Sequence, residues 1–410
     1  MKLSLRYYIL TGARAFSGGT NFLLTMFVAA TIPAVVVGDY ARLLNWATFA
    51  APYMSLGLTP YFTRELGKRS HDESQIIIYQ GVRQVIILVV MATILLGIAV
   101  GFEKFRGPGV STQAIYSLSI SSLIAGSLLI GGMFRGLGLP LWAELPLYLV
   151  APSIMAVGIL SLRPQTSGEL FLVFCSAQLF AFLMLTVRLA KYANWHYEKV
   201  PSPRLSIVLL ISIASTSLIT AGQLALAGIL FDSKSMANLH LGYVFANSVN
   251  LAFSSILAVH QKDISRAHHL AGEGGLQKTL NQINRALFSI GAPLFLALAL
   301  AVPVVQALLP EGYDNFTKVA FLFLIGQAFN FAGGPSAMFF LMVGGEKYLN
   351  YTLMTSAVVG LSLAFLSAAF SMEAFVGSLA LMTLAWNLTL VCLAKWQYGV
   401  HLHVFSFLLR

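Results

Sequence analysis

Long apolar runs, separated by short polar stretches, follow one another along the chain. Most exceed the roughly 20 apolar residues that a helix needs to cross a hydrocarbon core of about 30 Å. The runs are too long for strands, and backbone groups in lipid must bond within their own segment, which leaves helices. The pattern predicts twelve spans, at 8–33, 35–62, 76–101, 113–135, 138–161, 169–190, 205–230, 237–260, 284–307, 317–343, 349–370 and 373–395.

The longest polar break in the middle of the chain is RLAKYANWHYEKVPSPR, at residues 188–204. It carries four basic residues, two prolines and one acid, and apolar sequence of similar length lies on either side. We interpret it as a hinge between two membrane-embedded lobes. The predicted organisation is an N-terminal six-helix lobe (1–190), a cytoplasmic linker (191–204), a C-terminal six-helix lobe (205–395) and a cytoplasmic amphipathic tail (396–410) along the inner membrane surface.

The two halves share a rhythm. The second predicted helix ends in the charged stretch TRELGKRSHDES, and the eighth ends in HQKDISRAHHLAGEGGLQKTLNQINR. Each half therefore has its main predicted inner loop after its second helix. Six helices plus six, both sets starting inside, is the pattern of parallel repeats related by an axis along the membrane normal. The predicted fold class is an all-α membrane protein with twelve transmembrane helices in two such lobes.

Composition and charge agree with this pattern. The chain is 58% hydrophobic and 10% charged, whereas soluble domains are about 25% charged. With the N-terminus inside, most of the 25 Lys and Arg residues fall in the predicted inner loops, which predicts both termini in the cytoplasm. The net charge of +10 is therefore assigned to these loops, and no nucleic-acid partner is expected.

Polar residues recur at helical spacing inside the first, second, seventh and eighth spans. A charged side chain at the bilayer centre costs about 2.5–3.5 kcal/mol, so one that remains usually faces a wet interior. We interpret the stripes as the wall of a water-filled, cationic cavity; the alternative is helix-to-helix bonding, worth about 1 kcal/mol or less per bond. The candidate substrate-binding residues are Arg14, Asn21, Arg42, His240, Asn247 and Asn250.

Two acids are candidates for a gate or for ion coupling. Asp39 lies three residues before Arg42 and is expected to pair with it, which is equally consistent with a structural ion pair. Glu144 near the start of the fifth helix is the second, although capping or pairing with Arg135 is the simpler interpretation. At inner helix ends, Arg83, Arg135 and Arg285 are predicted inner-mouth cations or interfacial anchors.

Signals for enzyme chemistry are poor. The two cysteines fall inside apolar helices, and the paired histidines lack the further ligands of a zinc site. No serine is framed as G-x-S-x-G, and no phosphate-binding fingerprint exists. We therefore expect a protein that is not an enzyme and has no cofactor or metal.

Two stretches carry a family resemblance. Residues 38–66, GDYARLLNWATFAAPYMSLGLTPYFTREL, resemble the G-(E/D)-Y … G-L … (T/V)-R pattern of polysaccharide repeat-unit flippases of the Wzx type. Residues 308–350 resemble the G-x-x-Y … G-x-x-K pattern that these flippases carry across helices 9 to 11. Such flippases belong to the multidrug/oligosaccharidyl-lipid/polysaccharide exporter superfamily, and the resemblance covers essentially the whole chain.

The resemblance implies a MATE-like fold and a function. It implies movement of an undecaprenyl-pyrophosphate-linked oligosaccharide to the outer leaflet by alternating access, driven by an H⁺ or Na⁺ gradient or by the membrane potential. Arg14 matches the first-helix arginine of the cationic cavity in these flippases, and Asp39 the acid at the start of the second helix. The implied partners are the lipid-linked oligosaccharide, membrane lipids and polysaccharide polymerase machinery. One departure is that helices 7 and 8 offer no Lys or Arg in their interiors.

Three alternatives remain open. An ion-coupled drug or metabolite antiporter of the same superfamily would have the same topology, and a carboxylate-rich cavity would favour it. An unrelated twelve-helix facilitator would carry a G-x-x-x-D-R-x-G-R-R loop after helix 2, where TRELGKRS stands instead. A membrane polysaccharide polymerase would need a long outer loop with clustered Arg and acids, and the sequence has no such loop.

Overall fold

The computed structural model describes residues 20, 22–68, 71–106, 110–192, 207–270 and 272–408. Every regular element in these ranges is a helix, and the prediction of an all-helical fold is therefore confirmed. The described chain groups into two compact units. The C-terminal unit joins the described residues up to Gly38 with Ile229–Arg410, and the central unit is Asp39–Gly228.

The boundaries of the units fall inside helices rather than in a linker. Helix α2 (Ala34–Met54) is divided after Gly38, and helix α10 (Gln223–Leu230) after Gly228. The first predicted span therefore groups with helices of the predicted C-terminal lobe, and the seventh with helices of the N-terminal lobe. The predicted linker lies almost entirely outside the described residues, and the division into lobes at 191–204 stays a prediction.

The central unit is built around one buried helix, α5. Its apolar segment Ile115–Gly136 is 78% buried, more than that of any other candidate span in the described part of the chain. It packs against α3, α4, α6 and α8, with Phe62, Phe134 and Phe182 in the core between them. The helices of this unit after α2 are α3 (Leu58–Lys68), α4 (His71–Arg106), α5 (Val110–Gly136), α6 (Pro140–Leu145), α7 (Ala151–Leu162), α8 (Ser167–Ala190), α9 (Ile207–Ser217) and α10.

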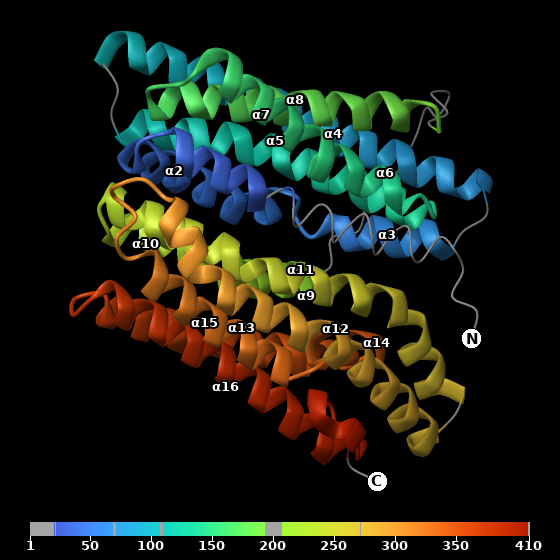
Figure 1. Cartoon of the computed structure of the whole chain (residues 1–410). Helices are drawn as coiled ribbons and strands as arrows, with labels where there is room; N and C mark the ends of the chain where they lie inside the picture. The colour runs from blue at the N-terminus through green and yellow to red at the C-terminus, as the bar shows by residue number, and fades with distance from the viewer. Residues whose placement is uncertain are drawn as a thin grey trace. The chain divides into compact units, whose positions relative to one another are not determined.

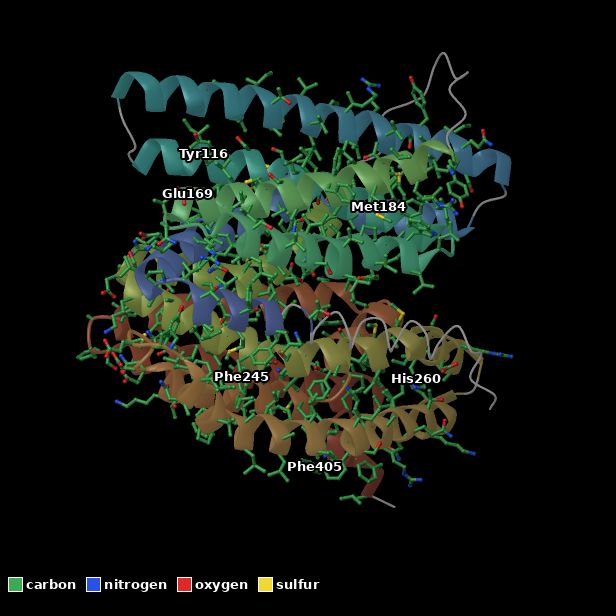
Figure 2. The ribbon with its side chains drawn as sticks, turned by 45° about the horizontal axis from the view of Figure 1, so that its top comes forward. Tyr116, Glu169, Met184, Phe245, His260 and Phe405 are labelled. Carbon is green, nitrogen blue, oxygen red and sulfur yellow. The ribbon has the colours of Figure 1, made fainter. Side chains whose placement is uncertain are left out.

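In the C-terminal unit, α13 packs against α11, α12 and α16 (Figure 1). The fully buried Phe245 ring lies between Phe22 and Phe316, with ring centroids at 5.3 and 5.8 Å (Figure 2). The elements are a helix at Phe22–Thr31, α11 (Ser233–Leu270), α12 (Gly272–Leu308), α13 (Phe316–Ala332), α14 (Ser336–Met342), α15 (Glu346–Ser367), α16 (Met372–Tyr398) and the 3₁₀ turn η3 (Val404–Leu408).

Four predicted spans are interrupted rather than continuous. Between α2 and α3, Leu56 and Gly57 adopt positive φ angles of 50° and 72°. A π-helical turn, Pro146–Val150, separates α6 from α7, and another, Leu218–Gly222, separates α9 from α10. Helices α13 and α14 meet at a bend of 41°. Prolines and π turns are common physical causes of such breaks.

The two predicted inner loops are mostly helical, so the sequence-based boundaries were wrong there. Helix α3 runs to Lys68 and α4 begins at His71. Helix α11 runs to Leu270 and α12 begins at Gly272, although the spans were predicted to end at 260 and begin at 284. Polarity marks where a helix leaves the lipid, but Ala, Leu, Gln, Lys and Arg continue a helix in water as readily as in lipid.

Seven helices in the described residues are long and apolar enough to cross a membrane, and the bent α13–α14 pair makes an eighth. Two further predicted spans coincide with shorter apolar helices, Phe22–Thr31 and Ala151–Leu162. The second and eighth predicted spans coincide with α2–α3 and α11. Each predicted span thus corresponds to helix where the structure describes it.

The predicted tail is not a separate amphipathic segment. Helix α16 continues to Tyr398, and Gly399 ends it with a left-handed φ of 64°. Beyond it, Val400, Leu402 and Val404 are fully buried within the C-terminal unit. The apolar face of this segment is therefore covered by protein rather than by lipid.

Candidate functional site

A chain of hydrogen-bonded polar side chains runs through the C-terminal unit, and we call it the amide chain. Asn250 on α11 donates to Asn247 at 3.3 Å and accepts from Asn330 on α13 at 3.4 Å. Asn387 on α16 donates to Asn330 at 3.4 Å and accepts from the Ser336 hydroxyl on α14 at 3.2 Å. Four helices of one unit are thus joined through uncharged groups.

The amide chain is buried at one end and half-buried at the other. Asn387 and Ser336 are 2% and 1% exposed, whereas Asn247, Asn250 and Asn330 are of intermediate exposure. Buried amides are costly unless hydrogen-bonded, yet these bonds lie at or beyond the long end of the usual range. Each contributes only about 0.5–1.5 kcal/mol net. The half-buried amides can therefore exchange their partners for ligand hydroxyl groups at little cost.

The amide chain passes the break between α13 and α14. Asn330 lies one turn before the break, and Ser336 is the first residue after it. A Cβ at Gly333 would collide with the Asn387 carbonyl oxygen, and Gly334 has a φ of 64°, which favours glycine. Pro335 offers no N–H to the backbone ladder. In secondary transporters, such discontinuous helices carry the substrate and ion sites.

Two of the five members of the amide chain are among the substrate-binding residues predicted from the sequence, and that role stays a prediction. Asn247 and Asn250 were predicted from the spacing of polar residues on the eighth helix, and the structure brings them together with Asn330 and Asn387. Those two were missed because α13 and α16 were expected as ordinary apolar spans, in which only Gln327 and Asn330, and Thr383 and Asn387, stand at helical spacing. The available signal was NFAGGPS at residues 330–336, in which an amide directly precedes a helix-breaking Gly-Gly-Pro.

The remaining predicted cavity residues do not join the amide chain in the described structure. Arg14 and Asn21 lie outside the described residues. His240 is 6% exposed within α11, seven residues before Asn247. Arg42 belongs to the central unit and Asn247 to the C-terminal unit. A cavity shared by these residues therefore stays a prediction.

Asp39 and Arg42 form the ion pair that their spacing predicts. The Asp39 carboxylate accepts from the Arg42 guanidinium at 3.1 Å, and both side chains are about one-third exposed, at 34% and 30%. A Cβ at Gly228 would lie 3.3 Å from the Arg42 Cγ, so the stem of Arg42 packs on α10. The pair couples the start of α2 in the central unit to α10.

Glu144 and the three predicted inner-mouth cations are distributed over both units. The Glu144 side chain is 9% exposed and lies 3.6 Å from the Arg135 guanidinium, which also donates to the Gly131 carbonyl at 3.3 Å. Arg83 is exposed on α4. Arg285 on α12 lies over the Phe407 ring at 5.9 Å, so it contacts the tail. A role for these groups in coupling or at an inner mouth stays a prediction.

Outside the spans, a salt bridge stabilises one end of the C-terminal unit. Lys234 donates to the Asp314 carboxylate at 2.9 Å, which raises the pKa of the lysine above its usual value. Asn238, one turn further along α11, donates to the Gly312 carbonyl at 3.0 Å. These contacts join the start of α11 to the turn before α13.

Comparison with solved structures identifies known proteins with a similar fold. A multidrug resistance MATE family transporter of the MOP superfamily in an inward-facing conformation matches with a TM-score of 0.67 and 13% identity, covering 95% of this chain and 98% of the other. An outward-facing structure of such a transporter matches with a TM-score of 0.63 and 14% identity, covering 96% and 94%. The chain has the MATE fold.

A third neighbour extends the range of functions on this fold. It is a MOP superfamily transporter from Pyrococcus furiosus, described as having a binding pocket of reverse polarity that suggests a different function. It has a TM-score of 0.61 and 14% identity, with 96% of this chain and 95% of the other covered. No protein-family model and no curated protein sequence match the chain.

Proposed function

We propose that the protein is a multi-pass transporter of the cytoplasmic membrane that moves an undecaprenyl-pyrophosphate-linked oligosaccharide to the outer leaflet by alternating access. In this proposal it supplies repeat units for a surface polysaccharide, and both termini face the cytoplasm. The transport part is supported by the MATE fold, whose solved examples are transporters captured facing inward and outward. The substrate class is supported by the residues of the amide chain.

The observation that carries the substrate class is that the amide chain has no charged member. Asn247, Asn250 and Asn330 are half-buried and present both donors and acceptors, which sugar hydroxyls need as partners. A cationic drug would instead be expected to meet a carboxylate. The amide chain also lies beside the broken helix α13–α14, and broken helices bind substrate in other transporters.

The pyrophosphate part of the substrate needs positive charge, which amides do not supply. In this proposal Arg14 and Arg42 provide it, because guanidinium groups bind phosphate oxygens in a bidentate manner. Asp39 and Glu144 are the proposed carboxylates for coupling to H⁺ or Na⁺.

The experiment is complementation of a bacterial strain that lacks its own repeat-unit flippase. We expect expression of the protein to restore surface polysaccharide and to relieve the accumulation of lipid-linked repeat units in the membrane. We expect Arg14→Ala and Asn330→Leu to abolish both effects while still inserting, and exposed Thr389→Ala on α16 to preserve them. Normal export with Asn330→Leu would remove the amide chain from the site.

The second candidate function is an ion-coupled drug or metabolite antiporter. The specific observation in its favour is that two of the solved neighbours are described as multidrug resistance transporters. The same cells distinguish the two functions. Lower accumulation of a fluorescent cationic drug, without any change in surface polysaccharide, would favour the antiporter and contradict the flippase.

A further inference from the structure

The segment after α16 shows a regular alternation of buried and exposed residues. Val400, Leu402, Val404 and Ser406 are 1%, 0%, 0% and 1% exposed, whereas Phe405 between the last two is 46% exposed. Residues 400–403 have no regular secondary structure and lead directly into the 3₁₀ turn Val404–Leu408, and both parts bury one set of side chains against the protein. We call residues 400–408 the strap.

The strap pairs with amides on one face of α12. The His401 N–H donates to the Gln277 carbonyl oxygen at 2.8 Å, and the Gln277 amide donates back to the His401 carbonyl at 3.2 Å. The Ser406 hydroxyl donates to the Asn281 carbonyl oxygen at 3.0 Å. Gln277, Asn281 and Asn284 are spaced i, i+4 and i+7, so they share a helix face.

Asn284 is the centre of this pairing. Its side chain is fully buried, and its amide nitrogen lies within hydrogen-bonding distance of the Leu402 carbonyl at 3.1 Å, the His403 carbonyl at 3.2 Å and the Ser406 hydroxyl at 2.8 Å. Its own carbonyl oxygen is buried and has no partner among the described residues. One side chain thus binds three successive parts of the strap.

Aromatic contacts continue the same face of α12. Phe405, which Figure 2 labels, and Phe407 lie with their ring centroids 5.8 and 5.7 Å from that of Phe288. Phe288 itself stacks on Phe331 of α13 at 6.4 Å. The strap therefore reaches α13 through Phe288 as well as lying on α12.

The strap also touches the break between α13 and α14 directly. A Cβ at Gly334 would collide with the Leu402 carbonyl oxygen and would lie 2.9 Å from the Asn284 carbonyl oxygen. The break is therefore held by two different groups. The amide chain lies against Gly333 through Asn387, and the strap lies against Gly334.

We propose that the strap holds the α13–α14 break at the bend observed here, and that it must lift from α12 for this bend to change during transport. The inference rests on the proposed function only in assigning a change of bend to the transport cycle. No space separates Gly334 from Leu402, so rotation of α14 about the break requires the strap to move. The strap is bound by hydrogen bonds, each of modest net strength, and by the buried side chains of Val400, Leu402 and Val404, so the transport cycle must supply the free energy for its release.

The first experiment locks the strap. In a variant without Cys175 and Cys392, Asn281→Cys and Ser406→Cys are joined by a short bis-methanethiosulfonate reagent, which a reductant removes. We expect the cross-link to stop export and the reductant to restore it. The matched control is Ser367→Cys with Ser378→Cys, a pair in the same unit whose hydroxyls are 2.9 Å apart; its cross-link should leave export unchanged.

Two outcomes of the first experiment overturn the proposal. Export that continues through the locked strap would make the strap a static part of the core. Failure of the pair to cross-link would mean that residues 400–408 do not dock on α12. The single-cysteine variants, treated in the same way, separate the lock from the loss of the Asn281 and Ser406 hydrogen bonds.

The second experiment needs no substrate, so it tests the strap even if the proposed function fails. We expect Asn284→Ala to raise hydrogen exchange at residues 333–345 by about tenfold, because the break loses its restraint. Thr279→Ala, on the same helix but bonded only to Gly275, should change nothing there. If Asn284→Ala unfolds the unit, Ser406→Ala provides a milder variant with the same expected direction. Unchanged exchange at the break would overturn the strap.

Discussion

The two units hold their polar groups in different places. In the central unit the ion pairs Asp39–Arg42 and Arg135–Glu144 lie near helix ends, and the buried polar side chains of α5 are serines, of which Ser119, Ser121 and Ser122 donate to backbone carbonyls of their own helix. In the C-terminal unit the interior itself contains the amide chain. Charges are expensive within a bilayer, whereas amides can be satisfied by one another. A neutral network can therefore lie deep in a helix bundle where an ion pair would be costly.

This comparison predicts that substitutions at the break in the C-terminal unit will have larger effects than removal of an ion pair in the central unit. Four variants or conditions test it, from the largest expected effect to the smallest.

Gly334→Ala should be the most damaging. The φ of 64° costs an alanine about 1–2 kcal/mol, and the collision with the Leu402 carbonyl adds about 1–3 kcal/mol. Gly344→Ala is the matched control, because its φ is 80° but nothing lies within 4 Å of an added Cβ. Thermal unfolding in detergent measures the difference, and equal losses for the two variants would mean that the strap contact contributes nothing.

Asn387→Leu should follow. It removes the acceptor of Ser336 and the donor to Asn330 and leaves both without these bonds inside the unit. We expect a loss of about 1–3 kcal/mol of unfolding free energy, together with loss of export. Asn387→Asp is the informative second variant, since it keeps the shape but introduces charge. Full export by the aspartate variant would contradict the requirement for a neutral chain.

Glu144→Gln should have a smaller effect. The Glu144 side chain is only 9% exposed, but its partner Arg135 at 3.6 Å is 34% exposed and the glutamine keeps the shape and can still accept a hydrogen bond, so we expect a loss of about 1 kcal/mol or less. We expect nearly unchanged thermal stability. A large loss of export with unchanged stability would instead support the predicted coupling role of Glu144, and a large loss of stability would contradict the contrast between the two units.

Lowering the pH should have the smallest effect, confined to the strap. Burial, His401 and Lys395 hold the pKa of His403 below its ordinary value. The released strap therefore binds a proton more readily than the docked one, so docking is strongest above a pH of about 6.5 and weakens as the pH falls below it. Hydrogen exchange at residues 400–408 measures this, and His403→Gln should abolish the pH dependence. The measured quantity is the protection relative to the intrinsic exchange rate at each pH, and protection of residues 400–408 that increases on acidification would contradict the expected direction.

The sequence predicted the fold class because long apolar runs fix the number and type of elements in a membrane protein. Asn247 and Asn250 were found because they repeat along one helix face. Asn330 and Asn387 each have only one polar neighbour at helical spacing, Gln327 and Thr383, and their tertiary contacts reveal them. The strap was missed for another reason. Its partners Gln277 and Asn281 lie in a stretch that was predicted to be a loop, and polar residues are common in loops, so they gave no sign of a helix face that binds another segment.

The breaks in the helices were also not predicted from the hydropathy pattern. The prolines near α6 and α14 were visible, but the π turn at Leu218–Gly222 contains no proline and no charged residue that would mark it. The unit boundaries inside α2 and α10 depend on which helices pack together. Hydropathy does not report such packing, because a lipid-facing and a protein-facing leucine look alike in sequence.

The length of α11 and α12 has a practical consequence for imaging. With 38 and 37 residues at about 1.5 Å per residue, each is about 55 Å long, well beyond a hydrocarbon core of about 30 Å. We therefore expect the adjoining ends of the two helices, which contain the polar stretch at residues 260–284, to extend out of the bilayer. A rigid fusion protein inserted between Leu270 and Gly272 would therefore lie outside the detergent belt. It would add a feature by which images of a small membrane protein can be aligned in electron cryomicroscopy.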